Sequence, residues 1–165
     1  MTELRIDAPN EKQRRFLLDR HRHIAYGGAR GGGKSWAVRT KAKLLALRYA
    51  GIKLLIVRRT LRELQNNHID PLRQELAGIA KYKAADKRFE FPNGSTITFG
   101  YCACDGDMGQ YQGAEYDVVF LDEAGQLQKA WIDAINACVR GTNGLPKRTY
   151  YTCLLYTSPS PRDCS

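Results

Sequence analysis

The chain has 165 residues, a length that suits a single domain able to bury a core of its own. Its 26 lysines and arginines against 17 acidic residues give a net charge of +9, which favours a polyanionic partner such as DNA or RNA, although the surplus can also serve only solubility. Since no apolar run approaches the roughly 20 residues of a membrane-spanning helix and no signal peptide is recognisable, we expect neither a membrane protein nor a secreted one.

The N-terminal part of the chain predicts one short helix and one short strand. Residues 1–10 are polar, and we expect them to be ordered only in part. Residues 11–18 alternate between polar and apolar side chains in the manner of a short amphipathic helix. Residues 23–26 follow as a short buried strand that leads into a run of glycines.

This glycine-rich run, residues 28–35, fits the Walker A or P-loop pattern G-x-x-x-x-G-K-[ST]. Glycines let successive backbone N–H groups turn inward around phosphates, and a helix predicted over residues 35–49 would direct the positive end of its dipole at them. Lys34 would then contact the β- and γ-phosphates, and the Ser35 hydroxyl would hold Mg²⁺. A loop that binds nothing is the alternative, but the strand–loop–helix context argues against it.

The middle of the chain predicts a strand, a helix and a hairpin. Residues 52–58 form a second buried strand, and residues 61–79 form a helix interrupted near Pro71, whose ring disfavours helical backbone at the preceding residue. Residues 89–91 and 96–99 flank a turn and predict a hairpin. The glycine-bearing residues 105–112 predict a loop.

A second motif follows the apolar run at residues 117–121. This run suits a strand buried on both faces of a parallel sheet. The run ends in Asp122 and Glu123, at the edge where open α/β sheets bind their ligands. In this Walker B pattern Asp122 would hold Mg²⁺ through water, and Glu123 would polarise the water that attacks the γ-phosphate. The alternative is a pair of acids that stabilise the N-terminus of the following helix, which can coexist with metal binding.

A helix over residues 127–139 and a strand over residues 147–152 complete the predicted elements. Strands that alternate with helices indicate an α/β fold with a mostly parallel sheet flanked by helices. The five cysteines include one close pair, Cys102 and Cys104, without the second pair that a zinc site needs. We therefore expect reduced thiols and no metal other than Mg²⁺.

The chain from Pro9 to Thr152 resembles the N-terminal ATPase domain of tailed-phage terminase large subunits, the motors that package DNA into capsids. This resemblance implies a P-loop NTPase fold with a RecA-like, mostly parallel sheet flanked by helices and truncated at its C-terminal end. The resemblance rests on short segments in the family's order: residues 9–13, the P-loop with an internal arginine at 26–35, then 56–60, 91–99, 111–113, the Asp-Glu-Ala box at 122–124, and 148–152. In relatives the last of these strands continues into an Asn-Pro coupling segment, whereas Cys153 follows here.

The resemblance implies further residue roles. Gln13 would recognise adenine, because its amide offers both a donor and an acceptor, and a solvated helix residue is the alternative. Arg30 would help Lys34 to stabilise the charge that develops in phosphoryl transfer. A neighbouring subunit could supply the guanidinium instead, and Arg58 and Arg59 are further candidates with DNA-facing or structural roles.

The expected sites follow from the motifs and the resemblance together. The expected catalytic residues are Lys34, Glu123 and Arg30. The expected ATP-binding residues are Gln13, Gly28, Ala29, Arg30, Gly31, Gly32, Gly33, Lys34, Ser35 and Trp36. The expected Mg²⁺ ligands are Ser35 and Asp122.

The resemblance implies an ATPase that translocates double-stranded viral DNA in the cytoplasm of a bacterial host. Its expected partners are the small terminase subunit, the portal protein, the capsid and further copies of itself, without a membrane. The nuclease domain of such proteins is not encoded in these 165 residues. The alternatives are another RecA-like nucleic-acid ATPase, such as a helicase, and a chain that binds ATP without turnover.

We expect residues 1–153 to form a terminase-like ATPase domain that is incomplete. Residues 154–165 contain Pro159 and Pro161 in a serine-rich stretch without an alternating apolar pattern. They resemble a translated sequencing-adapter tail, and we expect them to be disordered and artefactual; an ordinary disordered tail is the alternative.

Overall fold

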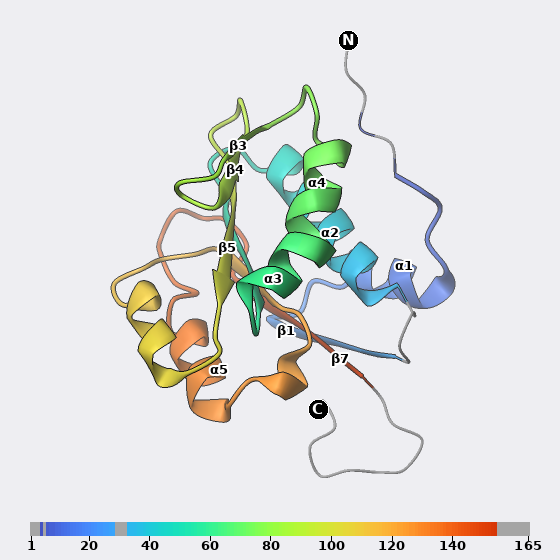
Figure 1. The fold of residues 1–165 in the computed structure, drawn as a ribbon. Helices are drawn as coiled ribbons and strands as arrows, with labels where there is room; N and C mark the ends of the chain where they lie inside the picture. Colours follow the sequence, from blue (N-terminus) through green and yellow to red (C-terminus); the bar gives the residue numbers. More distant parts are fainter. Residues whose placement is uncertain (1–3, 5, 29–32, 155–165) are drawn as a thin grey trace.

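A computed structural model of the protein describes residue 4, residues 6–28 and residues 33–154 (Figure 1). Within these described residues, seven strands form one sheet in the order β1-β7-β6-β2-β5-β4-β3. In this order the strands are His23–Gly28, Arg148–Leu154, Val118–Leu121, Lys53–Arg58, Thr96–Tyr101, Arg88–Glu90 and Lys81–Lys83. The neighbouring strands β1, β7, β6, β2 and β5 all pair in parallel, whereas β4 is antiparallel to β5 and β3 is antiparallel to β4. The predicted mostly parallel α/β sheet is therefore confirmed.

Helices cover both faces of the sheet. The α-helices are α1 (Glu11–Leu18), α2 (Lys34–Arg48), α3 (Leu61–Leu64), α4 (Asp70–Glu75) and α5 (Lys129–Asn136). A π-helix, Gln65–Ile69, joins α3 to α4, and short 3₁₀ helices span Asp105–Tyr111 and Ala124–Gln126. Figure 1 shows α1, α2 and the α3–α4 segment together on one side and α5 on the other.

The continuous apolar runs of the central strands are explained by this three-layer arrangement. In β2, Leu54 and Ile56 belong to the main core beneath α1, α2 and α4, whereas Leu55 and Val57 belong to a second core beneath α5. Strand β6 is buried along its whole length, as predicted for a strand covered on both faces. The two cores fix the strand register, since a slip of one residue would exchange them.

Three predicted elements differ from the structure. Residues 105–111 form a 3₁₀ helix instead of a loop, because Asp107 Oδ2 accepts the N–H groups of Ala103 and Cys104, and Asp105 accepts the Trp131 indole N–H at 2.7 Å. The helix expected over residues 61–79 ends at Glu75, and the interruption expected near Pro71 is the π-helix Gln65–Ile69, after which Pro71 lies in the first turn of α4, where its missing N–H is tolerated. Strand β3 was not predicted, because three residues with a single apolar side chain, Tyr82, are too short for a pattern to be recognised.

The C-terminal elements also differ in extent. The helix expected over residues 127–139 is shorter, Lys129–Asn136, because Leu127 and Gln128 at its expected start have extended backbone after the 3₁₀ helix Ala124–Gln126. Strand β7 continues to Leu154, which pairs with Gly28 of β1 and lies one residue inside the expected tail. Residues 155–165 lie outside the described part of the chain.

The Asp117 carboxylate accepts hydrogen bonds from several segments at the edge of the sheet where the parallel strands begin. Its Oδ2 accepts the Lys53 N–H at 2.8 Å, and its Oδ1 accepts Lys147 Nζ at 2.8 Å and Asn143 Nδ2 at 2.9 Å. Burial alone raises the pKa of Asp117, but the hydrogen bonds from Lys147, Lys53 and Asn143 lower it below its ordinary value. The carboxylate therefore joins β2, β6 and the loop before β7.

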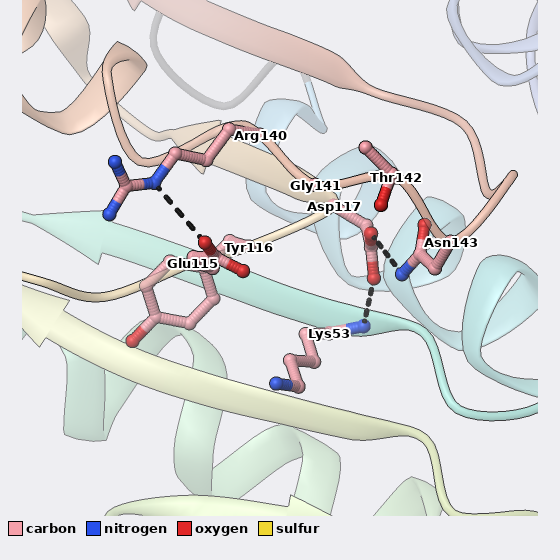
Figure 2. Close-up of a pocket in the computed structure, with 8 residues that line it drawn as sticks. All are labelled: Lys53, Glu115, Tyr116, Asp117, Arg140, Gly141, Thr142 and Asn143. Atoms are coloured by element: carbon pink, nitrogen blue, oxygen red, sulfur yellow. Dashed lines mark hydrogen bonds and ion pairs between the residues drawn. The ribbon is translucent and has the colours of Figure 1, made fainter.

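A pocket of about 280 Å³ opens beside Asp117 (Figure 2). Its polar groups are largely committed to the protein itself, since Asp117 has three donors and Arg140 Nε lies 3.5 Å from Glu115 Oε1. It lies at the opposite edge of the sheet from the glycine-rich loop, so it is no part of the site predicted from the motifs. In the described part of the chain, no helix combines the length and apolar character needed to cross a membrane.

Candidate functional site

The two predicted motifs meet at the edge where the parallel strands end. Strand β1 leads into the glycine-rich loop, α2 begins at Lys34 directly after it, and the acids Asp122 and Glu123 follow β6. Gly33 has φ +77°, a left-handed conformation that glycine adopts without strain, so the chain can turn sharply into α2. The expected positions Ala29, Arg30, Gly31 and Gly32 lie outside the described residues.

Lys34 lies in the first turn of α2, with only 5% of its surface exposed. Its Nζ donates a hydrogen bond to the carbonyl of Gly28 at 3.1 Å and lies 3.9 Å from Glu123 Oε1. The ammonium group is thus placed between the end of β1 and the acid after β6. A charge held in this partly desolvated position acts on a bound anion more strongly than a charge in open water.

Asp122 is fully buried and surrounded by donors. Its Oδ2 accepts hydrogen bonds from Ser35 Oγ at 3.1 Å, Arg58 Nη1 at 2.9 Å and His68 Nε2 at 2.7 Å, and its Oδ1 accepts one from the Thr152 hydroxyl. Burial alone raises the pKa of Asp122, but the interactions with His68, Arg58 and Thr152 outweigh it and hold the pKa well below its ordinary range. These four hydrogen bonds fix the orientation of the Asp122 carboxyl group.

Glu123 adopts an unusual backbone conformation. Its φ of 57° and ψ of 50° lie in the left-handed region, which costs a residue with a side chain about 1 kcal/mol or more. The conformation is held by its N–H, which donates to Thr152 Oγ1 at 2.9 Å. The Glu123 side chain faces Lys34 and remains 16% exposed. Strain of this kind clusters at functional sites, and here it directs a carboxylate toward the predicted phosphate site.

Gln13 connects α1 to the end of the glycine-rich loop. It is 9% exposed, its Oε1 accepts the Asn10 N–H at 3.0 Å, and its Nε2 donates to the Gly33 carbonyl at 3.3 Å. The alternative interpretation of Gln13 as a solvated helix residue is therefore wrong. Its role in adenine recognition stays a prediction, as does nucleotide contact by Trp36, which is half-buried against the main core.

Sequence reasoning missed two residues that hold Asp122, Thr152 and His68, and left the role of a third, Arg58, open. Arg58 was considered for phosphate, DNA or structure; it is buried and pairs with Asp122. Thr152 could have been found, because it ends a predicted parallel strand at the same edge as Asp122. No sequence signal indicates that His68 contacts Asp122, because its position depends on the π-helix Gln65–Ile69.

The donors at this edge fit Mg²⁺. The Ser35 hydroxyl and the Asp122 carboxylate, 3.1 Å apart, are hard oxygen ligands of the kind that Mg²⁺ prefers. Within the described residues, no group of three or more His, Cys, Asp or Glu side chains could hold a metal ion. A pair of protein oxygens suits Mg²⁺, which usually takes its other ligands from substrate phosphates and water.

Solved structures of phage large terminases, and of the ATPase domain of one of them, share this fold. The large terminase of a thermophilic bacteriophage matches with a TM-score of 0.71 and 18% identity over 87% of this chain and 38% of that chain. The complex of the same terminase with ADP matches with a TM-score of 0.70, 18% identity and the same coverage. The ATPase domain of the large terminase of Thermus phage P74-26 matches with a TM-score of 0.69 and 16% identity over 88% of this chain and 64% of that chain. The fold is therefore that of the terminase ATPase domain.

Residues 25–153 match the family described as "Terminase large subunit, T4likevirus-type, N-terminal". Because the match spans most of the chain, this chain belongs to the terminase large subunit family. No curated protein sequence matches it. The chain spans about two-fifths of the length of the thermophilic bacteriophage terminase.

Proposed function

We propose that this chain is the ATP-hydrolysing domain of a viral DNA-packaging motor. One observation carries the proposal: two motifs far apart in sequence bring a lysine, a hydroxyl and two acids to one edge of the sheet. Lys34 lies 3.9 Å from Glu123, and Ser35 lies 3.1 Å from Asp122. Membership of the terminase family and the ADP complex of the thermophilic bacteriophage terminase support a nucleotide as the ligand.

Each residue of the site has a chemical task in this proposal. Lys34 neutralises charge on the β- and γ-phosphates, and Ser35 and Asp122 provide the protein oxygens for Mg²⁺. When bound, Mg²⁺ would supply further charge neutralisation at the phosphate oxygens. Glu123, partly exposed beside Lys34, orients the attacking water and accepts its proton.

The remaining contacts of the proposed site come from the glycine-rich loop and α1. Backbone N–H groups of residues 28–35 surround the phosphates, Trp36 lies next to them in sequence, and Gln13 recognises adenine. Phosphoryl transfer depends mainly on positioning and charge neutralisation, so an arginine completes the site. We assign this task to Arg30 of the same chain, with an arginine of a neighbouring subunit as the alternative.

Nucleotide binding by the chain tests the proposal. A fluorescent ATP analogue should bind in the presence of Mg²⁺, and unlabelled ATP should displace it, because the site neutralises phosphate charge and carries the oxygens for the metal. Addition of EDTA should weaken binding. If the analogue does not bind, or binds equally well after ATP is added in excess, the proposed function is wrong.

We propose double-stranded DNA as the substrate that the motor moves, because the chain carries a net charge of +9. Binding should be independent of DNA sequence and should weaken by about tenfold or more between 50 and 200 mM salt, since lysines and arginines release counterions from phosphates. Titration of a labelled duplex and of a duplex with a permuted sequence measures both effects. Absence of binding at 50 mM salt would mean that the charge serves solubility alone.

The wider setting of the proposal follows from the family. Residues 1–153 act as an ATPase domain within a packaging complex that contains the small terminase subunit, the portal protein, the capsid and further copies of the chain. The complex works in the cytoplasm of the bacterial host. DNA cleavage is not assigned to these 165 residues, because they show no nuclease motif.

A further inference from the structure

His68 donates a hydrogen bond to Asp122, one of the two predicted metal ligands. The side chain is fully buried, and Nε2 lies 2.7 Å from Asp122 Oδ2. The same oxygen accepts hydrogen bonds from Arg58 Nη1 and Ser35 Oγ, so it acts as an acceptor, and Nε2 carries the hydrogen that it donates. Asp122 Oδ2 is the same oxygen that Ser35 Oγ contacts at 3.1 Å. His68 therefore acts on the oxygen that faces the hydroxyl of the glycine-rich loop.

The other ring nitrogen of His68 argues against a purely structural role. Nδ1 is buried and has no hydrogen-bond partner among the described residues, although buried polar groups normally have one. A histidine retained only for packing gains nothing over a leucine here, because an orphaned buried nitrogen lowers stability. The feature that a leucine could not replace is the hydrogen bond from Nε2 to Asp122.

The backbone around His68 has a special conformation and is held by contacts with α2. His68 lies in the π-helix Gln65–Ile69, and π-helical turns occur frequently at functional sites. Helix α2, which starts at the glycine-rich loop, contacts this π-helix and the helix after it: Arg39 Nη1 donates to the Asn67 carbonyl at 2.5 Å, and Lys43 Nζ lies 2.7 Å from Oε2 of Glu75 in α4. The helix that carries Lys34 and the segment that carries His68 are thus fixed to each other.

We propose that His68 is a positioning residue for Asp122 in the metal–nucleotide site. Its hydrogen bond orients the carboxylate toward Ser35, so that Mg²⁺ bound with the nucleotide meets a fixed oxygen ligand. Groups that orient metal ligands in this way commonly change metal affinity by about 10- to 100-fold when they are removed. The role rests on the proposed nucleotide site, since Asp122 is a metal ligand only there.

Two substitutions separate the hydrogen bond from packing. His68→Leu keeps an apolar side chain in the buried space but has no donor, whereas His68→Gln retains an amide N–H that can replace Nε2–H. Ile69→Val serves as a control, because it alters a buried neighbour in the same segment without removing a polar group. Thermal unfolding of all three variants establishes that they fold.

Mn²⁺ bound together with ATPγS, followed by electron paramagnetic resonance, reports the metal site directly. We expect His68→Leu to weaken Mn²⁺ binding by about 10- to 100-fold. ATPγS affinity without metal should stay unchanged, and His68→Gln and Ile69→Val should remain close to the parent. Equal Mn²⁺ affinity in His68→Leu and the parent, or no recovery in His68→Gln, would overturn the role of His68 and leave the proposed function standing. Absence of nucleotide-dependent Mn²⁺ binding in the parent would overturn both.

Discussion

Glu123→Gln is expected to retain ATP binding and to slow ATP hydrolysis by about 10²- to 10⁴-fold, the usual contribution of a general base. The amide has nearly the same shape as the carboxylate but cannot accept the proton of the attacking water. The backbone conformation of Glu123 should persist, because Thr152 Oγ1 holds its N–H and not its side chain. Binding and chemistry should therefore separate in this variant.

Phosphate release under single-turnover conditions measures this effect, because slow rates are still resolved. Glu115→Gln is the matched control: it makes the same chemical change in a half-exposed acid that pairs with Arg140 at the opposite edge of the sheet. The control should hydrolyse ATP at the rate of the parent. Hydrolysis by Glu123→Gln at the parental rate would assign the base to another residue.

Lys34→Ala is expected to weaken Mg·ATP binding by about 10- to 100-fold. The substitution removes a charge-assisted contact worth about 1.5–3 kcal/mol, and each 1.4 kcal/mol corresponds to a factor of ten. It also leaves Glu123 without the ammonium group that lies 3.9 Å away, so repulsion of the phosphates should add to the loss. The effect should appear in affinity before any step of hydrolysis.

Isothermal titration calorimetry with ATPγS and Mg²⁺ measures the change in affinity. Lys129→Ala provides the control, because Lys129 is exposed and pairs with Asp133 on the surface of α5. Circular dichroism and thermal unfolding must show that both variants fold. Unchanged affinity in a folded Lys34→Ala variant would mean that the glycine-rich loop does not bind phosphate.

The parts of the site that could be predicted from the sequence are those in which a short segment contains the whole chemical requirement. The glycines, Lys34 and Ser35 stand next to one another, so their spacing alone indicates a phosphate-binding loop followed by a helix. Asp122 and Glu123 close an apolar strand, and parallel strands bring their C-terminal ends to one edge. The structure places the described members of both motifs together at that edge.

The surroundings of Asp122 could not be predicted in the same way, because its donors come from separate elements. Arg58 ends β2, His68 lies in a π-helix and Thr152 lies in β7. Their meeting depends on the strand order β7-β6-β2, which no local pattern contains. The π-helix was missed for a related reason: Pro71 indicated an interruption, but no local pattern indicated the wider π-helical turn before it.

The same distinction between local and distant contacts explains the 3₁₀ helix at residues 105–111. Its glycines predicted a loop, but Trp131 of α5 donates to Asp105 from a distant part of the chain and helps to hold the turn in place. Gln13 is a further example, since its burial depends on contact with Gly33 rather than on the pattern of its own helix. Local patterns thus predicted the longer helices and the central strands, whereas strand β3, the π-helix and the 3₁₀ helix at residues 105–111 were not predicted.

A crystal structure of this chain with Mg²⁺ and ATPγS would test the proposed nucleotide site most directly. We predict that Lys34 Nζ is within hydrogen-bond distance of the β- or γ-phosphate oxygens, that Mg²⁺ lies beside Ser35 and Asp122, and that the Glu123 carboxylate faces the γ-phosphate. A nucleotide bound elsewhere, such as in the pocket beside Asp117, with Lys34 still donating to the Gly28 carbonyl, would contradict the proposed site.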